Sequence, residues 1–319
     1  MSCDAVWVVC FDELSTTDAT KMAGGGDAEP ADGLHSLLGR STWFERCLTT
    51  TTCDDEGWHA PFGTAASFSH LLQHRRSAFI CVGEANEQGG RYSDDVERLF
   101  SETQCVADDQ IAVDDHILSD ATFIWWRIPA SAGSDSKTNL SHILARILKL
   151  KDDPCRRHTP ISVIVTARRG GSQIPQPPFQ PGIAADRIHV PLWIDTGEVF
   201  SCRTQQLCST NDLLLTARAL LGEDLQNPVP ESGPVDAPLN LVPFLRQPES
   251  QIPRRIRLRT DSERAVYSED FLATQSIPSD SDVPCELQLY VQPDDYWCIH
   301  DIATVDPEVA AELGRFLNQ

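Results

Sequence analysis

Short apolar runs, each ending at polar or glycine-rich positions, recur along the first half of the chain. Residues 6–11, 78–82, 121–126 and 161–166 have the length and continuous apolar character of strands buried on both faces of a sheet. Residues 139–150 carry leucine and isoleucine at helical spacing between two of these strands. This order predicts a βαβ unit with a right-handed crossover, and therefore an α/β domain with a mostly parallel sheet.

The second half of the chain adds one more apolar run and then changes character. Residues 188–194 are apolar, and residues 209–222 form a capped helical pattern that ends in glycine. Proline is frequent in the segment that follows, after which short strands lead to a last helix. We therefore expect an α/β domain over residues 1–222, a connecting segment over 223–253 and a C-terminal subdomain over 254–319.

Two further helices are expected in the polar parts of the chain. Residues 66–75 place apolar side chains on one face, and residues 94–103 form the other helix. His70 and His74 lie one helical turn apart in the first helix, a spacing at which two histidines could hold a transition metal. No acidic third ligand occurs at a matching spacing, so histidines that face solvent are the other interpretation.

Composition narrows the class of protein. The chain has 319 residues, of which 41% are hydrophobic, and this is typical of a globular protein with a large core. Its formal net charge of −21 argues against nucleic acid or an anionic membrane surface as a partner. No apolar run reaches membrane-spanning length, and the first residues lack the basic region of a signal peptide. We expect a cytoplasmic protein.

The cysteines do not form a recognisable framework. Eleven is an odd number, so they cannot all pair within one chain, and no Cys-x-x-Cys motif offers a zinc site. Cys10, Cys81 and Cys155 lie in or beside apolar segments, where we expect reduced thiols that fill the core.

Three motifs in the middle of the chain resemble, in order and spacing, the sulfatase branch of the alkaline-phosphatase-like superfamily. In that family a strand ends in Thr-Ser-Asp-His-Gly, a later segment reads His-Val-Pro-Leu, and a Ser-Thr-x-Asp-Leu helix follows. The matching residues here are Thr166-Ala167-Arg168-Arg169-Gly170, His189-Val190-Pro191-Leu192 and Ser209-Thr210-Asn211-Asp212-Leu213. The resemblance implies a three-layer α/β sandwich with a mostly parallel central sheet, a small C-terminal antiparallel sheet and a terminal helix.

The resemblance also implies a metal position, which is altered in this chain. Family members end the first strand in Asp-Asp, which ligates a divalent cation, usually calcium; Asp12 and Glu13 stand there. Arg168 and Arg169 occupy the places of the other ligands, although a guanidinium has no lone pair to give to a cation. We expect no calcium, and we consider that either arginine pairs with Asp12 and Glu13. The alternatives are two exposed arginines with no specific role, or arginines that bind a small anion.

The nucleophile motif of the family is altered as well. Family members carry Cys-x-Pro-x-Arg, whose cysteine is oxidised to formylglycine. Cys53 is the candidate here, but Asp55 replaces the proline and Gly57 replaces the arginine. The neighbouring carboxylates would raise the pKa of a Cys53 thiol and repel an anionic substrate. Glu84 stands where many sulfatases have a lysine that contacts sulfate, which reverses the charge.

Two classes of function are compatible with these residues. In the first, the chain is a non-catalytic protein with a sulfatase fold, which binds a small anion or a protein partner through the former cleft. In the second, it is an active sulfuric or phosphoric ester hydrolase with a rebuilt site, in which Asp12 and Glu13 hold calcium. The loss of three separate motifs favours the first class. A third interpretation is a coincidence of fold with an unrelated function.

Overall fold

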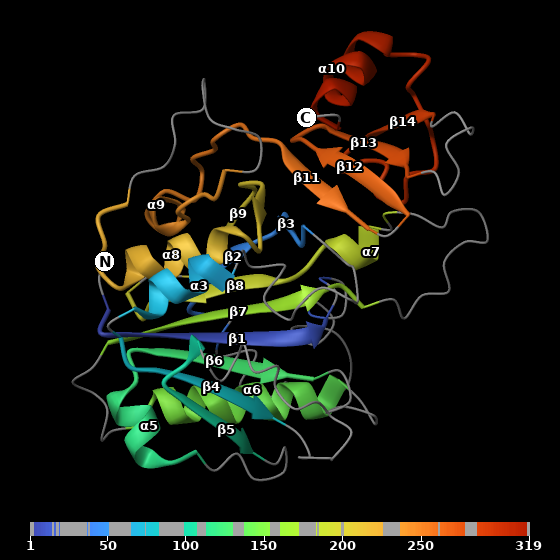
Figure 1. Cartoon of the computed structure of the whole chain (residues 1–319). Helices are drawn as coiled ribbons and strands as arrows, with labels where there is room; N and C mark the ends of the chain where they lie inside the picture. The colour runs from blue at the N-terminus through green and yellow to red at the C-terminus, as the bar shows by residue number, and fades with distance from the viewer. Residues whose placement is uncertain are drawn as a thin grey trace.

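The structure is a computed structural model of the whole chain (Figure 1). It describes most of the strands and helices that the sequence predicts. The described residues are 3–14, 16, 19, 37, 39–50, 65–73, 75–82, 99–106, 113–129, 137–153, 160–171, 183, 185–198, 201–225, 237–260, 262–277 and 286–317.

A central sheet of eight strands has the order β5-β4-β6-β1-β7-β8-β2-β9 (Figure 1). The five strands from β5 to β7 are parallel, whereas β8 runs antiparallel to both of its neighbours, β7 and β2. The bounds are Glu102–Val106 (β5), Ser77–Val82 (β4), Phe123–Ile128 (β6), Ala5–Glu13 (β1), Ile161–Arg169 (β7), Leu192–Asp195 (β8), Thr42–Phe44 (β2) and Cys202–Thr204 (β9). The expected mostly parallel sheet is confirmed.

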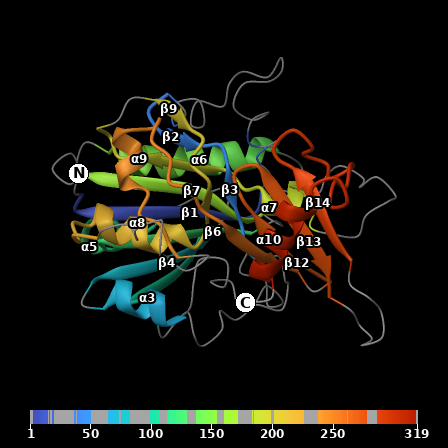
Figure 2. The same ribbon diagram turned by 90° about the horizontal axis from the view of Figure 1, so that it is seen from above.

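Helices cover both faces of this sheet and complete three layers. Helix α6 (Lys137–Lys151) lies on one face, and α3 (Ala65–Leu72) and α8 (Asp212–Leu220) lie on the other (Figure 2). Helix α6 buries Ile143, Leu144, Ile147 and Leu148, the stripe that its sequence pattern predicts. The remaining short helices are α5 (Asp115–Asp120), α7 (Ala185–Ile188) and α9 (Val242–Arg246).

The inner strands are apolar without interruption because both of their faces are covered. The first seven residues of β1 and of β7 are buried, and burial decreases only at the carboxyl ends. Large rings fill the space between strands and helices; Trp7 on β1 and Trp126 on β6 approach to 5.9 Å between ring centroids. The polar side chains of β1 and β6 are therefore concentrated where these strands end, at the carboxyl edge of the sheet.

Strands β3 (Cys47–Leu48) and β10 (Cys208–Ser209) form a small parallel pair beside the central sheet. A separate antiparallel sheet follows in the order β11-β12-β13-β14. Its strands are Ile256–Arg259, Glu263–Tyr267, Phe271–Ser276 and Leu287–Val291, and the last helix, α10, is Pro307–Leu317.

Successive side chains of this second sheet pack against different partners, because both of its faces are covered. Val266 and Leu289 pack against Leu313 of α10. Ala265 and Tyr267, on the opposite face, pack against the α/β part of the chain in a cluster that contains Leu48, Ile188 and Leu207. The sheet is therefore a layer between α10 and the larger part of the molecule (Figure 1).

Several details differ from the sequence-based expectations. The helix expected over residues 94–103 is wrong at its end, because Glu102 and the next residues form the edge strand β5. Strand β7 continues beyond the predicted run 161–166 to Arg169, so the two arginines are its last residues. Strand β1 lies between β6 and β7, so the predicted βαβ unit spans one intervening strand. In the part of the chain that the structure describes, no helix is both long enough and apolar enough to span a membrane.

Candidate functional site

Asp12 and Arg127 form the best-defined contact at the carboxyl edge of the sheet. Arg127 Nε donates to Asp12 Oδ1 at 2.9 Å, and Arg127 Nη2 donates to Asp12 Oδ2 at 2.7 Å. Cys10 and Arg127 are partners in the β1–β6 register, so the arginine side chain extends two residues along the strand direction to reach Asp12. Both carboxylate oxygens therefore accept a charge-assisted hydrogen bond from one guanidinium.

This contact is partly shielded from water. The Asp12 side chain is 18% exposed and the Arg127 side chain is 30% exposed. The hydrogen bond to Asp12 raises the pKa of Arg127 further above its usual value, against the opposing effect of burial. Arg127 consequently holds a fixed positive charge beside Asp12.

Glu13, the second carboxylate of the expected metal position, lies beside β7. Glu13 and Arg169 are register partners, and Arg169 Nη2 lies 4.0 Å from Glu13 Oε2. Each side chain is just over one-third exposed, so this ion pair is loose and screened by solvent. Arg168 is level with Asp12 in the register, and its charge acts on the Cys10 thiol.

The expected pairing is therefore right for one carboxylate and wrong for the other. Arg169 pairs with Glu13, but the hydrogen-bond partner of Asp12 is Arg127, a residue outside the matched motifs. A signal was present: Arg127 follows the apolar run 121–126 as Asp12 follows 6–11. Parallel strands place such residues at the same edge, but the sequence does not reveal that β6 is the neighbour of β1.

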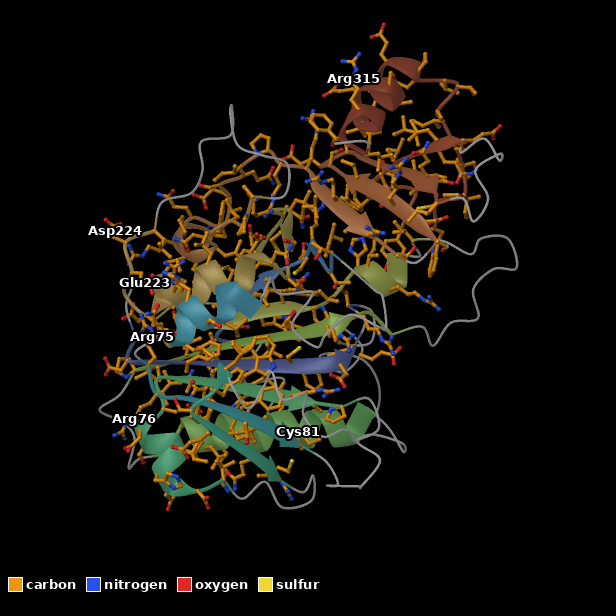
Figure 3. The ribbon with its side chains drawn as sticks, viewed as in Figure 1. Arg75, Arg76, Cys81, Glu223, Asp224 and Arg315 are labelled. Atoms are coloured by element: carbon orange, nitrogen blue, oxygen red, sulfur yellow. The ribbon has the colours of Figure 1, made fainter. Side chains whose placement is uncertain are left out.

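Two thiols, those of Cys10 and Cys81, lie near the Arg127 guanidinium. Cys10 is 3% exposed, and burial followed by the charge of Asp12 raises its pKa well above the usual value, while Arg127 and Arg168 oppose the shift. Cys81 on β4 is the register partner of Arg127 on its other side, and Figure 3 labels it. Cys10 is thus the buried core thiol that the sequence predicts, whereas Cys81 is only partly buried and Cys155 lies outside the described residues.

The donors at this edge fit a dication poorly. A cation on Asp12 would lie next to the Arg127 charge. Two unit charges about 4 Å apart at an effective dielectric near 20 interact by about 4 kcal/mol, and because a dication carries two charges, its repulsion by Arg127 would be about twice as large. Arg168 and Arg169 add to that repulsion from the β7 side. Within the described residues, no group of three or more His, Cys, Asp or Glu side chains could hold a metal ion.

Cys53 with Asp55 and Gly57, and Glu84 in the position of the substrate lysine, all lie outside the described residues. Their catalytic or binding roles stay predictions. His70 is an exposed residue of α3, and its suggested partner His74 also lies outside the described residues.

A second polar group joins the α/β part to the C-terminal sheet. Arg46 Nη2 donates to the carbonyl oxygens of Ser268, at 3.4 Å, and of Glu269, and its guanidinium lies 5.8 Å from the Tyr267 ring centroid. His189 is buried against Tyr267, with ring centroids 5.7 Å apart. Burial, followed by the nearby Arg46 charge, lowers the pKa of His189 to about 4, so the imidazole is neutral at pH 7. This group stabilises the contact between the two parts.

Comparison with known proteins shows the fold without sequence similarity. No protein-family model matches the chain, and no curated protein matches its sequence. A 6S-sulfatase from a locus with which Bacteroides thetaiotaomicron metabolises multiple glycosaminoglycans superposes with a TM-score of 0.70 at 12% identity, over 100% of this chain and 99% of that one.

Two further solved structures give the same result. A 2-O glycosaminoglycan sulfatase has a TM-score of 0.63 at 12% identity, over 99% of this chain and 91% of its own. A protein of the alkaline phosphatase superfamily from Vibrio parahaemolyticus has a TM-score of 0.56 at 12% identity, over 99% and 89% of the two chains. The chain therefore has the fold of sulfatases and alkaline-phosphatase-like proteins, as its three motifs indicated.

Proposed function

We propose that this chain is a non-catalytic protein with the sulfatase fold, in which arginine side chains take the place of the metal ion. The observation that supports this most directly is the two-point contact of Arg127 with Asp12. In an active site that used Asp12 as a metal ligand, its carboxylate oxygens would have to bind a dication. Here the permanent charge of the Arg127 guanidinium neutralises the Asp12 carboxylate.

Charge at the sheet edge supports the same proposal. At this edge Arg127, Arg168 and Arg169 stand beside two carboxylates, Asp12 and Glu13. Arginine side chains favour a small anion over a cation. A retained anion-binding role for Arg168 and Arg169, or contact with a protein partner, is therefore compatible with the loss of catalysis, and neither nucleic acid nor a membrane is needed.

The competing function is an active sulfuric or phosphoric ester hydrolase. Its only direct support is the fold itself, which the sulfatases above share. It requires calcium at Asp12 and Glu13 and a nucleophile such as Cys53, so it predicts that metal content and turnover change together.

Metal analysis of the purified protein, combined with aryl sulfate and aryl phosphate assays, separates the two functions. We expect substoichiometric calcium and a background rate that Asp12→Asn with Glu13→Gln does not change. A content of one calcium per chain, with turnover that this double variant abolishes, would overturn the proposal. Arg76→Met is a suitable control for the effect of replacing an arginine far from the site, because Arg76 pairs with Asp120 at the opposite edge of the sheet (Figure 3).

A further inference from the structure

Two buried cysteines, far apart in the sequence, lie side by side in the small sheet. Cys47 on β3 and Cys208 on β10 are register partners in parallel strands, and both are completely buried. Register partners in neighbouring strands place their side chains on the same face of a sheet, so the two thiols project from the same face of this pair. Sequence reasoning did not connect these residues, because about 160 residues separate them and neither lies in a Cys-x-x-Cys motif.

The backbone around Cys47 is held on two sides. Cys208 N donates to the Arg46 carbonyl at 3.0 Å, and Thr210 N donates to the Leu48 carbonyl at 2.9 Å. On the other side, Val190 N donates to the Cys47 carbonyl at 3.0 Å. These bonds maintain the register, so Cys47 and Cys208 stay paired while the protein is folded.

The spacing of paired strands suits a covalent bond between these sulfurs. Neighbouring strands lie about 4.8 Å apart, and disulfides join Cα atoms that are about 4.4–6.8 Å apart. No change in register is required.

We propose that Cys47 and Cys208 are a disulfide-forming pair that covalently joins β3 to β10. With oxidised glutathione as the oxidant, one thiolate attacks a glutathione sulfur, and glutathione thiolate leaves. The second cysteine thiolate then attacks the mixed disulfide and displaces the protein-bound glutathione. Two protein thiols lose two electrons and two protons, and one glutathione disulfide becomes two molecules of glutathione.

Burial determines when this exchange can take place. Burial raises the pKa of Cys208 well above its usual value, so the folded protein presents almost no reactive thiolate at this position. The reaction therefore proceeds through local opening of the pair or during folding, and the closed bond is then protected. In a reducing compartment the same pair remains a dithiol.

The bond should stabilise the protein, because it closes a loop of about 160 residues and so restricts the unfolded chain. In the test, native full-length protein is incubated with oxidised glutathione in urea concentrations below the unfolding transition. Free thiols are then alkylated, and peptides are mapped without reduction. We expect a peptide pair that contains Cys47 and Cys208, and a urea midpoint that rises after oxidation and falls back with dithiothreitol.

Cys81 and Cys105 provide an internal comparison. They are register partners on β4 and β5, and Cys105 is exposed, so it should react readily with oxidant. Cys105→Ser should keep the Cys47–Cys208 peptide pair and the rise in midpoint, whereas Cys208→Ser should lose both. The proposal is overturned if Cys47 and Cys208 are still alkylated after Cys105 has been oxidised completely. It is also overturned if the rise in midpoint persists in Cys208→Ser.

Discussion

Replacing Arg127 by methionine tests whether this arginine neutralises Asp12, as the proposed function requires. The change removes both hydrogen bonds to Asp12 and keeps an unbranched apolar side chain against β1 and β4. Removing one partner of a fully buried ion pair costs about 3–5 kcal/mol. Because the side chains of Asp12 and Arg127 are 18% and 30% exposed, solvent screens part of this, and we expect about 2–3 kcal/mol.

A double-mutant cycle measured by urea denaturation isolates the contact itself. Arg127→Met and Asp12→Asn should each destabilise the protein, and the double variant should lose about 1–2 kcal/mol less than the sum, because neither partner is left alone. Arg76→Met is the matched control. Arg76 pairs with Asp120 on the surface, where their side chains are 70% and 50% exposed, and its loss should cost less than about 1 kcal/mol.

Two results would refute the reasoning. If the effects of Arg127→Met and Asp12→Asn simply add, within about 0.5 kcal/mol, the two side chains act independently and the contact does not neutralise Asp12. If calcium raises the urea midpoint of the unaltered protein, calcium binds the folded state, although the arginines were expected to exclude it.

Two further predictions concern single side chains. His189 has a pKa of about 4 when folded against 6.5 when exposed, so the unfolded chain binds its proton first. Stability should fall as the pH decreases from 6.5 to 4, by about 3 kcal/mol in total, and His189→Phe should remove this component when unfolding free energies of the two proteins are compared at each pH. Arg168→Glu places a carboxylate level with Asp12 and reverses the charge beside it. We expect a clear decrease in the melting temperature, measured by scanning calorimetry. An unchanged melting temperature would place Arg168 away from the carboxylates.

The fold could be predicted largely because the central strands carry their burial in their composition. Continuous apolar runs identified β1, β4, β6 and β7, and the helical stripe identified α6. Elements with mixed composition were missed. Strand β13 is half polar, although it lies between β12 and β14, and β5 is an edge strand whose pattern alternates between partly buried and exposed residues. Edge strands have one free side, so their sequences need not resemble those of buried strands.

The site could be predicted only in part, because its contacts depend on strand order. The carboxylates Asp12 and Glu13 and the two arginines of β7 followed from local motifs. The contribution of Arg127 and the adjacency of Cys47 and Cys208 depend on which strands become neighbours, a property of the complete topology. Periodicity within one segment carries no information about this.

Strand order also places positive charge on both sides of the two carboxylates of this edge. Strand β1 lies between β6 and β7, so Asp12 and Glu13 have arginines on both sides: Arg127 from β6, and Arg168 and Arg169 from β7. Without either a dication or these arginines, two carboxylates at a partly buried edge would repel each other. Each arginine reduces that repulsion and at the same time opposes a dication. Removing one of them therefore cannot restore a metal site, because the remaining two still oppose the cation and no third ligand takes their place among the described residues.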